Sequence, residues 1–314
     1  MSVRHELRRW AGLPRRRFSR LKLESRLVWI AGSPRTGSTW LADLIADDRR
    51  CVRIFEPLIG LHLGIRSTAV AHVPERQLVE KPRVVDLRTD EHYFFAAQRS
   101  ELWSPVLRKL ILRRFSSYLR PEAEAYIVHE PNGSDGADII MQSLPKSRLL
   151  FLMRDARDVI DSILDAYRTG SWLDMAFGVG RDLTPRDRVE LIETESYRWL
   201  TRTRVVQRAF DEHDPRLRYY LRYEDLLSDT STELAHILAW MNLARPADFN
   251  ERVDRHSFGS IPAEQTGPGK FHRAASPGLW KETWTAEEKR LCGAILDPTL
   301  EEYGYGPTTL ETTR

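Results

Sequence analysis

A short strand that runs directly into a glycine-bounded loop and a helix is the feature that most constrains the fold of this chain. Residues 27–31 read Leu-Val-Trp-Ile-Ala, an apolar, β-prone run, and Gly32 and Gly37 bracket the loop that follows. Residues 40–45 then carry apolar side chains at helical spacing. In such an arrangement backbone N–H groups and the helix dipole converge on an anion. The segment therefore predicts a phosphate-binding loop.

The cation of this loop stands inside it rather than at its end. The spacing from Gly32 to Gly37 matches the phosphate-binding loop of nucleoside triphosphatases, and Thr39 supplies the hydroxyl of that pattern. Ser38, however, occupies the position where those enzymes need lysine, and Arg35 provides the positive charge instead. The loop is thus expected to bind a phosphate that does not belong to a triphosphate.

The loop resembles the 5′-phosphosulfate loop of sulfotransferases, the enzymes that use 3′-phosphoadenosine 5′-phosphosulfate (PAPS). In that family a basic residue, a glycine, two hydroxyl residues and a tryptophan follow a strand, as they do in residues 35–40 here. The resemblance implies that PAPS is the cofactor and that Trp40 flanks its adenine, although a core position for Trp40 is the alternative. The cofactor-binding residues implied in this loop are Arg35, Thr36, Gly37, Ser38, Thr39 and Trp40.

Two further segments resemble the same family. The apolar run 149–153 ends at Arg154, and Ser162 follows eight positions later on an expected helix, which is the form of the family's 3′-phosphate site. Near the C-terminus, Arg273 precedes Gly278 and a Trp-Lys pair, as in the family's cofactor-covering loop. The resemblance implies that Arg154, Ser162 and Arg273 bind the 3′-phosphate. Residues 222–227 also resemble a family segment, which we interpret as a strand end whose carboxylates cap the next helix.

The chain is expected to form an α/β fold, a P-loop-type open parallel sheet flanked by helices in three layers. Strands alternating with helices favour a parallel sheet. Residues 26–314 would form one sulfotransferase domain, preceded by a basic segment, residues 1–25. Residues 57–123 and 168–190 are predicted to be helical or loop insertions at the carboxyl edge of the sheet, with Trp172 more typical of core than of a substrate contact. The expected strands are residues 26–31, 125–129, 148–153 and 217–222.

Charge and cysteine content limit the partners of the protein. The 314 residues carry a net charge of +3, and residues 1–26 hold nine Arg and Lys against two Glu. This segment is either a solvated leader or a weak contact for an anionic surface, and no motif indicates a specific nucleic-acid partner. Two cysteines make no disulfide framework, and their spacing to the histidines matches no metal site. Without a signal peptide or membrane span in the sequence, a cytoplasmic enzyme that requires no metal is expected.

Transfer of a sulfuryl group to a hydroxyl acceptor requires a base and a stabilised leaving group. Arg35 is the candidate for the second role. Glu56, in a Phe-Glu-Pro segment, and His129, at the end of an expected strand, are both candidates for the base. The resemblance implies a small-molecule or glycan acceptor, with a carbohydrate or glycolipid hydroxyl as one option. The alternatives are a nucleotide kinase, which Ser38 disfavours, and a non-catalytic polyanion-binding protein on the same fold.

Overall fold

A five-stranded parallel sheet forms the centre of the molecule in the computed structural model, which describes residues 22–46, 49–71, 83–274 and 276–308. The basic segment 1–25 and its expected contact with an anionic surface lie almost entirely outside the described residues. Neighbouring strands follow the order β2-β5-β1-β6-β7, and every pair is parallel. The strands of this sheet are β1 (Leu27–Ala31), β2 (Cys51–Phe55), β5 (Ala125–His129), β6 (Arg148–Met153) and β7 (Arg218–Arg222).

The central strands are buried on both faces, which explains their continuous apolar sequences. Every residue of β1 and β5 is buried, and so are residues 149–153 of β6. The four expected strands are confirmed as β1, β5, β6 and β7. The sequence analysis missed the fifth strand, β2, in which the polar Arg53 interrupts a short apolar run.

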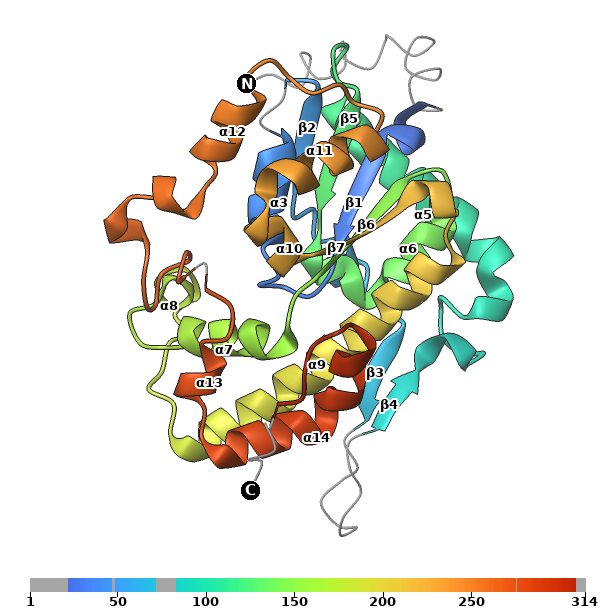
Figure 1. Cartoon of the computed structure of the whole chain (residues 1–314). Coiled ribbons are helices and arrows are strands. Elements are labelled where there is room, and N and C mark those ends of the chain that lie inside the picture. Colours follow the sequence, from blue (N-terminus) through green and yellow to red (C-terminus); the bar gives the residue numbers. More distant parts are fainter. Residues whose placement is uncertain (1–21, 47–48, 72–82, 275, 309–314) are drawn as a thin grey trace, which may run out of the picture.

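Helices cover both faces of the sheet, so the expected three-layer α/β architecture is confirmed (Figure 1). Val28 and Ile30 of β1 face one helical layer, and Leu27 and Trp29 face the other. The first layer contains α3 (Ser38–Ala46), α10 (Tyr223–Ser228), α11 (Thr230–Trp240) and α12 (Phe249–Arg255). The second contains α5 (Ser100–Phe115), α6 (Ala137–Ser143), α7 (Ala156–Ala166), α9 (Pro185–Glu212) and α14 (Ala286–Glu302).

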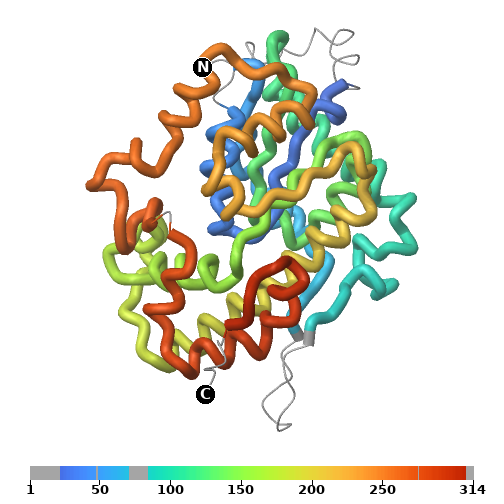
Figure 2. Tube along the Cα trace, viewed as in Figure 1, coloured from blue at the N-terminus to red at the C-terminus, as the bar shows by residue number. Residues whose placement is uncertain are grey.

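Two parts of the chain are inserted around this frame. The first includes α4 (Ile59–His62) and an antiparallel hairpin of β3 (Thr68–Ala71) and β4 (Arg83–Asp86), which packs against α9. The expectation of only helices and loops in residues 57–123 was therefore wrong at this hairpin. The second includes α8 (Trp172–Phe177), and its neighbour in space is the C-terminal segment that leads to α13 (Trp280–Thr283), as Figure 2 shows. No described helix is long and apolar enough to cross a membrane.

Candidate active site

The two glycines of the loop between β1 and α3 are required by close contacts. A Cβ atom on Gly32 would lie 2.2 Å from the carbonyl oxygen of Leu152 in the neighbouring strand. Gly37 has a φ of 84°, in the left-handed region that favours glycine, and a Cβ atom there would lie 2.6 Å from the ring of Tyr223. The loop is therefore clamped between β6 and the residue that follows β7.

The hydroxyl groups of the loop point in different directions. Thr36 is buried and donates a 2.8 Å hydrogen bond to the carbonyl of Ser33. Its hydroxyl proton is therefore used within the loop. Ser38 is also buried, and its Oγ lies 2.9 Å from Nε2 of His129. Thr39 is half-buried in the first turn of α3.

Arg35 joins the loop to α7 and to the C-terminal segment. Its Nε donates to Oγ of Ser162 over 3.0 Å, and its Nη2 donates to the carbonyl of Phe271 over 2.9 Å. Arg154 donates from Nη1 to the carbonyl of Arg35 over 2.9 Å, while its buried Nε has no hydrogen-bond partner in the described part of the chain. The structure thus brings Arg35, Arg154 and Ser162 together, as the sequence predicts.

Arg273 completes a cluster of three arginines. Burial and the nearby charges of Arg154 and Arg273 lower the pKa of Arg35 to about 10, against the opposing effect of Asp165. Arg273 itself forms an ion pair of 2.6 Å with Asp161 and a longer one of 3.7 Å with Asp165. Mutual repulsion among partly desolvated guanidinium groups makes this point of the molecule a favourable place for an anion with several charges.

Three buried carboxylates of α7, which we call the carboxylate row, hold the C-terminal segment in place. They are Asp158, Asp161 and Asp165, spaced so that they lie on one face of the helix. Buried carboxylates are costly unless they receive hydrogen bonds, so these contacts define the path of the segment. The donors to the row are Gly269 N, Arg273 Nη1, Gly278 N, Thr283 Oγ1 and Trp284 Nε1.

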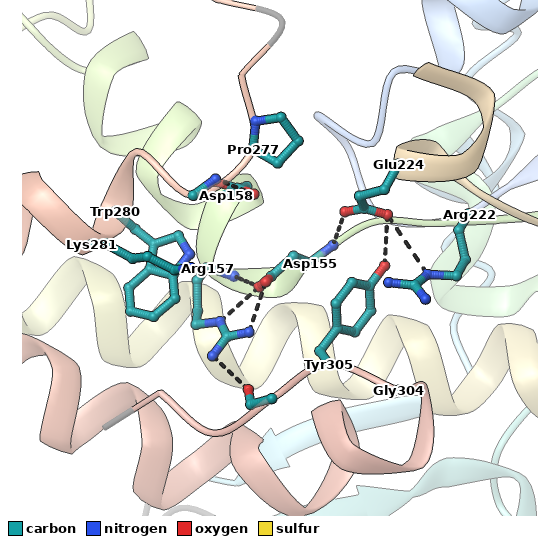
Figure 3. A pocket seen from close by; sticks show the side chains of 12 residues that line it. Asp155, Arg157, Asp158, Arg222, Glu224, Pro277, Trp280, Lys281, Gly304 and Tyr305 are labelled. Carbon is teal, nitrogen blue, oxygen red and sulfur yellow. Dashed lines mark hydrogen bonds and ion pairs between the residues drawn. The ribbon is translucent and has the colours of Figure 1, made fainter. Parts of the chain in front are cut away.

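A pocket of about 260 Å³ lies at the N-terminal end of α7, beside this segment (Figure 3). Arg157 is fully engaged there, since it binds both oxygens of Asp155 and the carbonyl of Gly306. Glu224 accepts hydrogen bonds from Asp155 N at 3.0 Å and from the Tyr305 hydroxyl at 2.9 Å. The prediction that the carboxylates of residues 222–227 cap the next helix was therefore wrong for Glu224, which binds the start of α7 instead.

The two candidate bases lie together at the ends of β2 and β5. His129 is completely buried, and its Nδ1 lies 3.9 Å from Oε1 of Glu56. Burial, together with the charge of Arg53, lowers the pKa of His129 to about 4, so the ring is neutral at physiological pH. The Glu56 side chain is 32 % exposed, and partial burial raises its pKa although Arg53 opposes the rise. Only Glu56 is open to an incoming molecule.

Aromatic residues border the arginine cluster, and Phe271 lies 4.9 Å from the guanidinium carbon of Arg35. The Tyr223 ring lies 4.3 Å from the guanidinium carbon of Arg154 and meets Trp40 edge to face at 5.9 Å between ring centres. Trp40 also donates from its indole to the carbonyl of His256. Trp172 lies 5.3 Å from the guanidinium carbon of Arg35. The sequence analysis assigned Tyr223 and Trp172 to structural roles, although Tyr223 follows a strand end at the carboxyl edge of the sheet, which is a signal for a ligand contact.

Comparison with known proteins identifies the family. Residues 28–247 match the model of the sulfotransferase family. The chain belongs to the sulfotransferase family. No curated protein matches the sequence. Among solved structures, the chain is similar to sulfotransferase STF9 from Mycobacterium avium, with 13 % identity, a TM-score of 0.52 and coverage of 91 % of this chain and 78 % of that one. It is also similar to retinol dehydratase in complex with retinol and PAP, with 15 % identity and a TM-score of 0.50. This similarity covers 88 % of this chain and 82 % of that one.

Family membership confirms the expected class of enzyme and makes the kinase and non-catalytic alternatives unnecessary. The similarity to the two solved structures, at this level of identity, extends to the fold. The five-stranded parallel sheet and its helical layers are therefore those of a sulfotransferase.

Proposed function

We propose that this protein transfers the sulfuryl group of PAPS to a hydroxyl acceptor. The observation that carries the proposal is the cluster of Arg154 and Arg273 near Arg35, which also contacts Ser162; among the described residues the buried Nε of Arg154 has no hydrogen-bond partner. A donor with phosphate groups at both the 3′ and 5′ positions supplies the charge and the acceptors that this cluster lacks. The solved retinol dehydratase contains PAP, which is consistent with such a ligand.

The contacts suggest which residues bind each part of the donor. Arg35, the amides of residues 36–39 and the Thr39 hydroxyl would bind the 5′-phosphosulfate at the start of α3. Arg154, Ser162 and Arg273 would bind the 3′-phosphate, as the sequence predicts. Tyr223 and Trp40 form an aromatic edge beside the loop and Arg154, where the adenine would lie.

Glu56 is the base in this proposal. It accepts the proton of the acceptor hydroxyl while that oxygen forms its bond to sulfur, and the bond between sulfur and the 5′-phosphate oxygen breaks. Arg35 stabilises the charge that develops on the departing phosphate. His129 has no accessible ring nitrogen, because one lies against Ser38 and the other faces Glu56 within the core.

The acceptor class and the domain limits are further parts of the proposal. Carbohydrate and glycolipid hydroxyls are the first acceptors to test. Because arginines supply the positive charge of the site, we expect EDTA to leave the rate unchanged. Residues 26–314 would make up the catalytic domain, with residues 1–25 as an attached basic segment.

Calorimetry with two nucleotides tests the donor assignment. We expect adenosine 3′,5′-bisphosphate to bind at least tenfold more tightly than AMP, because each charge-assisted hydrogen bond to the 3′-phosphate contributes on the order of 1.5–3 kcal/mol. Arg154→Ala should abolish most of this preference, whereas Arg186→Ala, at an exposed residue paired with Glu190, should preserve it. Equal affinity of the wild-type protein for both nucleotides would refute the assignment.

A further inference from the structure

The turn that presents Glu56 is held in an unfavourable backbone conformation. Glu56 has a φ of 34° and Leu58 a φ of 53°, so two non-glycine residues within three positions lie in the left-handed region. Non-glycine residues are strained in this region, so surrounding contacts must hold them in place. The backbone N–H of Glu56 donates to the carbonyl of His129 over 2.9 Å, which secures the first half of the turn.

Glu130 secures the second half. Its Oε2 accepts a hydrogen bond of 3.3 Å from the backbone N–H of Ile59, directly after the strained pair. Gly133 leaves the space for this side chain, since a Cβ atom there would lie 2.5 Å from Cγ of Glu130. The carboxylate therefore lies beneath the turn rather than on the open side of the site.

Burial of the Glu130 carboxylate carries a desolvation cost that a neutral hydrogen-bond acceptor at this position would not have. The residue is 3 % exposed, and its Oε1 has no hydrogen-bond partner among the described residues. Burial is the main cause that raises the pKa of Glu130 to about 7; the amides of residues 58 and 59 oppose the rise, and Glu56 contributes to it. A glutamine could accept the same hydrogen bond without the cost of a buried charge.

We propose that Glu130 is a positioning residue for Glu56, because its carboxylate holds the turn that presents the base. The inference rests on the proposed function. The hydrogen bond from Ile59 N links the Glu130 carboxylate directly to the turn that carries Glu56.

Two substitutions separate the contact from the charge. Glu130→Gln keeps an oxygen that can accept from Ile59 N but removes the charge, whereas Glu130→Leu removes both. We would measure the titration midpoint of Glu56 by ¹³C NMR of carboxyl-labelled glutamate in protein saturated with adenosine 3′,5′-bisphosphate, with Glu56→Gln to assign the signal. The midpoint should keep its wild-type value in Glu130→Gln, which retains the acceptor. It should fall toward the ordinary glutamate value in Glu130→Leu, because a released turn exposes the Glu56 carboxyl group and partial burial is what raises its pKa.

The rate of sulfuryl transfer provides the second measurement. In Glu130→Gln kcat should match that of the wild-type protein, and in Glu130→Leu kcat should fall about tenfold while the affinity for the bisphosphate stays unchanged. Glu122→Gln, at an exposed residue before β5, serves as the matched control. A wild-type Glu56 midpoint and kcat in Glu130→Leu, or an equal loss in both Glu130 variants, would overturn the inference. Absence of transfer by the wild-type protein would instead overturn the proposed function, since the NMR titration does not depend on turnover.

Discussion

At the scale of single residues, burial separates the two candidate bases. Burial lowers the pKa of His129 to about 4, whereas partial burial raises the pKa of Glu56. We expect Glu56→Gln to lower kcat by roughly 10²–10⁴-fold, the usual effect of removing a general base, with bisphosphate affinity retained. In the wild-type profile, kcat should rise through a midpoint above the ordinary glutamate value, because the base must lose its proton to act. Steady-state kinetics as a function of pH and isothermal calorimetry check both expectations.

His129→Asn provides the comparison for that measurement. This variant alters the contact with Ser38, so a moderate loss of activity is expected, but the acidic limb of the profile should stay where it is in the wild-type protein. If instead Glu56→Gln retained the full rate and the limb disappeared in His129→Asn, the assignment of the base would be reversed.

The sequence predicts which site residues carry charge better than it predicts which of them are accessible. Arg35, Arg154, Ser162 and Arg273 are brought together as the motifs indicate. The protonation state and the accessibility of His129 depend on how deeply the end of β5 is buried. That burial is a property of the packed sheet and cannot be obtained from local sequence. For the same reason the contact of Tyr223 with the loop was missed, because 186 positions separate it from Gly37.

At the scale of secondary-structure elements, the carboxylate row of α7 determines where the C-terminal segment lies. We expect Asp161→Asn to release part of this segment, because the ion pair with Arg273 is lost while the amide oxygen can still accept from Thr283 and Trp284. Limited trypsin digestion should cut after Lys270 and Arg273 about tenfold faster, which corresponds to the loss of one charge-assisted hydrogen bond of about 1.5 kcal/mol.

Asp182→Asn, at an exposed residue before α9, is the control for the digestion and should match the wild-type rate. Equal cleavage rates for Asp161→Asn and Asp182→Asn would show that the ion pair does not hold the segment.

Strands could be predicted from the sequence where burial on both faces of the sheet makes them continuous apolar runs. Buried strands on both sides of β1 are continuous apolar runs and were predicted, whereas β2 and the hairpin of β3 and β4 were missed. These strands are at the edge of the sheet or outside it, so half of their surface is free to carry polar residues, and their sequences lose the pattern that marks a strand.

At the scale of the whole molecule, buried carboxylates make stability depend on pH. Burial raises the pKa of Asp158 to about 6, from an ordinary value near 4. The folded protein therefore binds more protons than the unfolded chain between these values, and the free energy of unfolding falls as the pH rises through this range. Relative to the wild-type protein, Asp158→Asn should gain stability between pH 4 and pH 6, by at most about 3 kcal/mol. Urea unfolding at a series of pH values measures this difference.

The comparison of variant with wild type cancels the contributions of all other titrating groups. Asp182→Asn should show no such gain over the same range. A difference between Asp158→Asn and wild type that stayed constant from pH 4 to pH 6 would mean that Asp158 titrates normally in the folded protein.

The contact between Arg157 and Gly306 can form only late in the synthesis of the chain. This arginine lies at the start of α7, yet the carbonyl that it binds belongs to Gly306, which is 149 positions further along the chain. At a translation rate of about 5–20 residues per second, roughly 7–30 s pass between the synthesis of the two residues. Strands β1, β2, β5 and β6 precede Arg157 in the chain, whereas β7, α14 and Gly306 are made after it. The pocket at the start of α7 can therefore be completed only when nearly the whole chain has been synthesised.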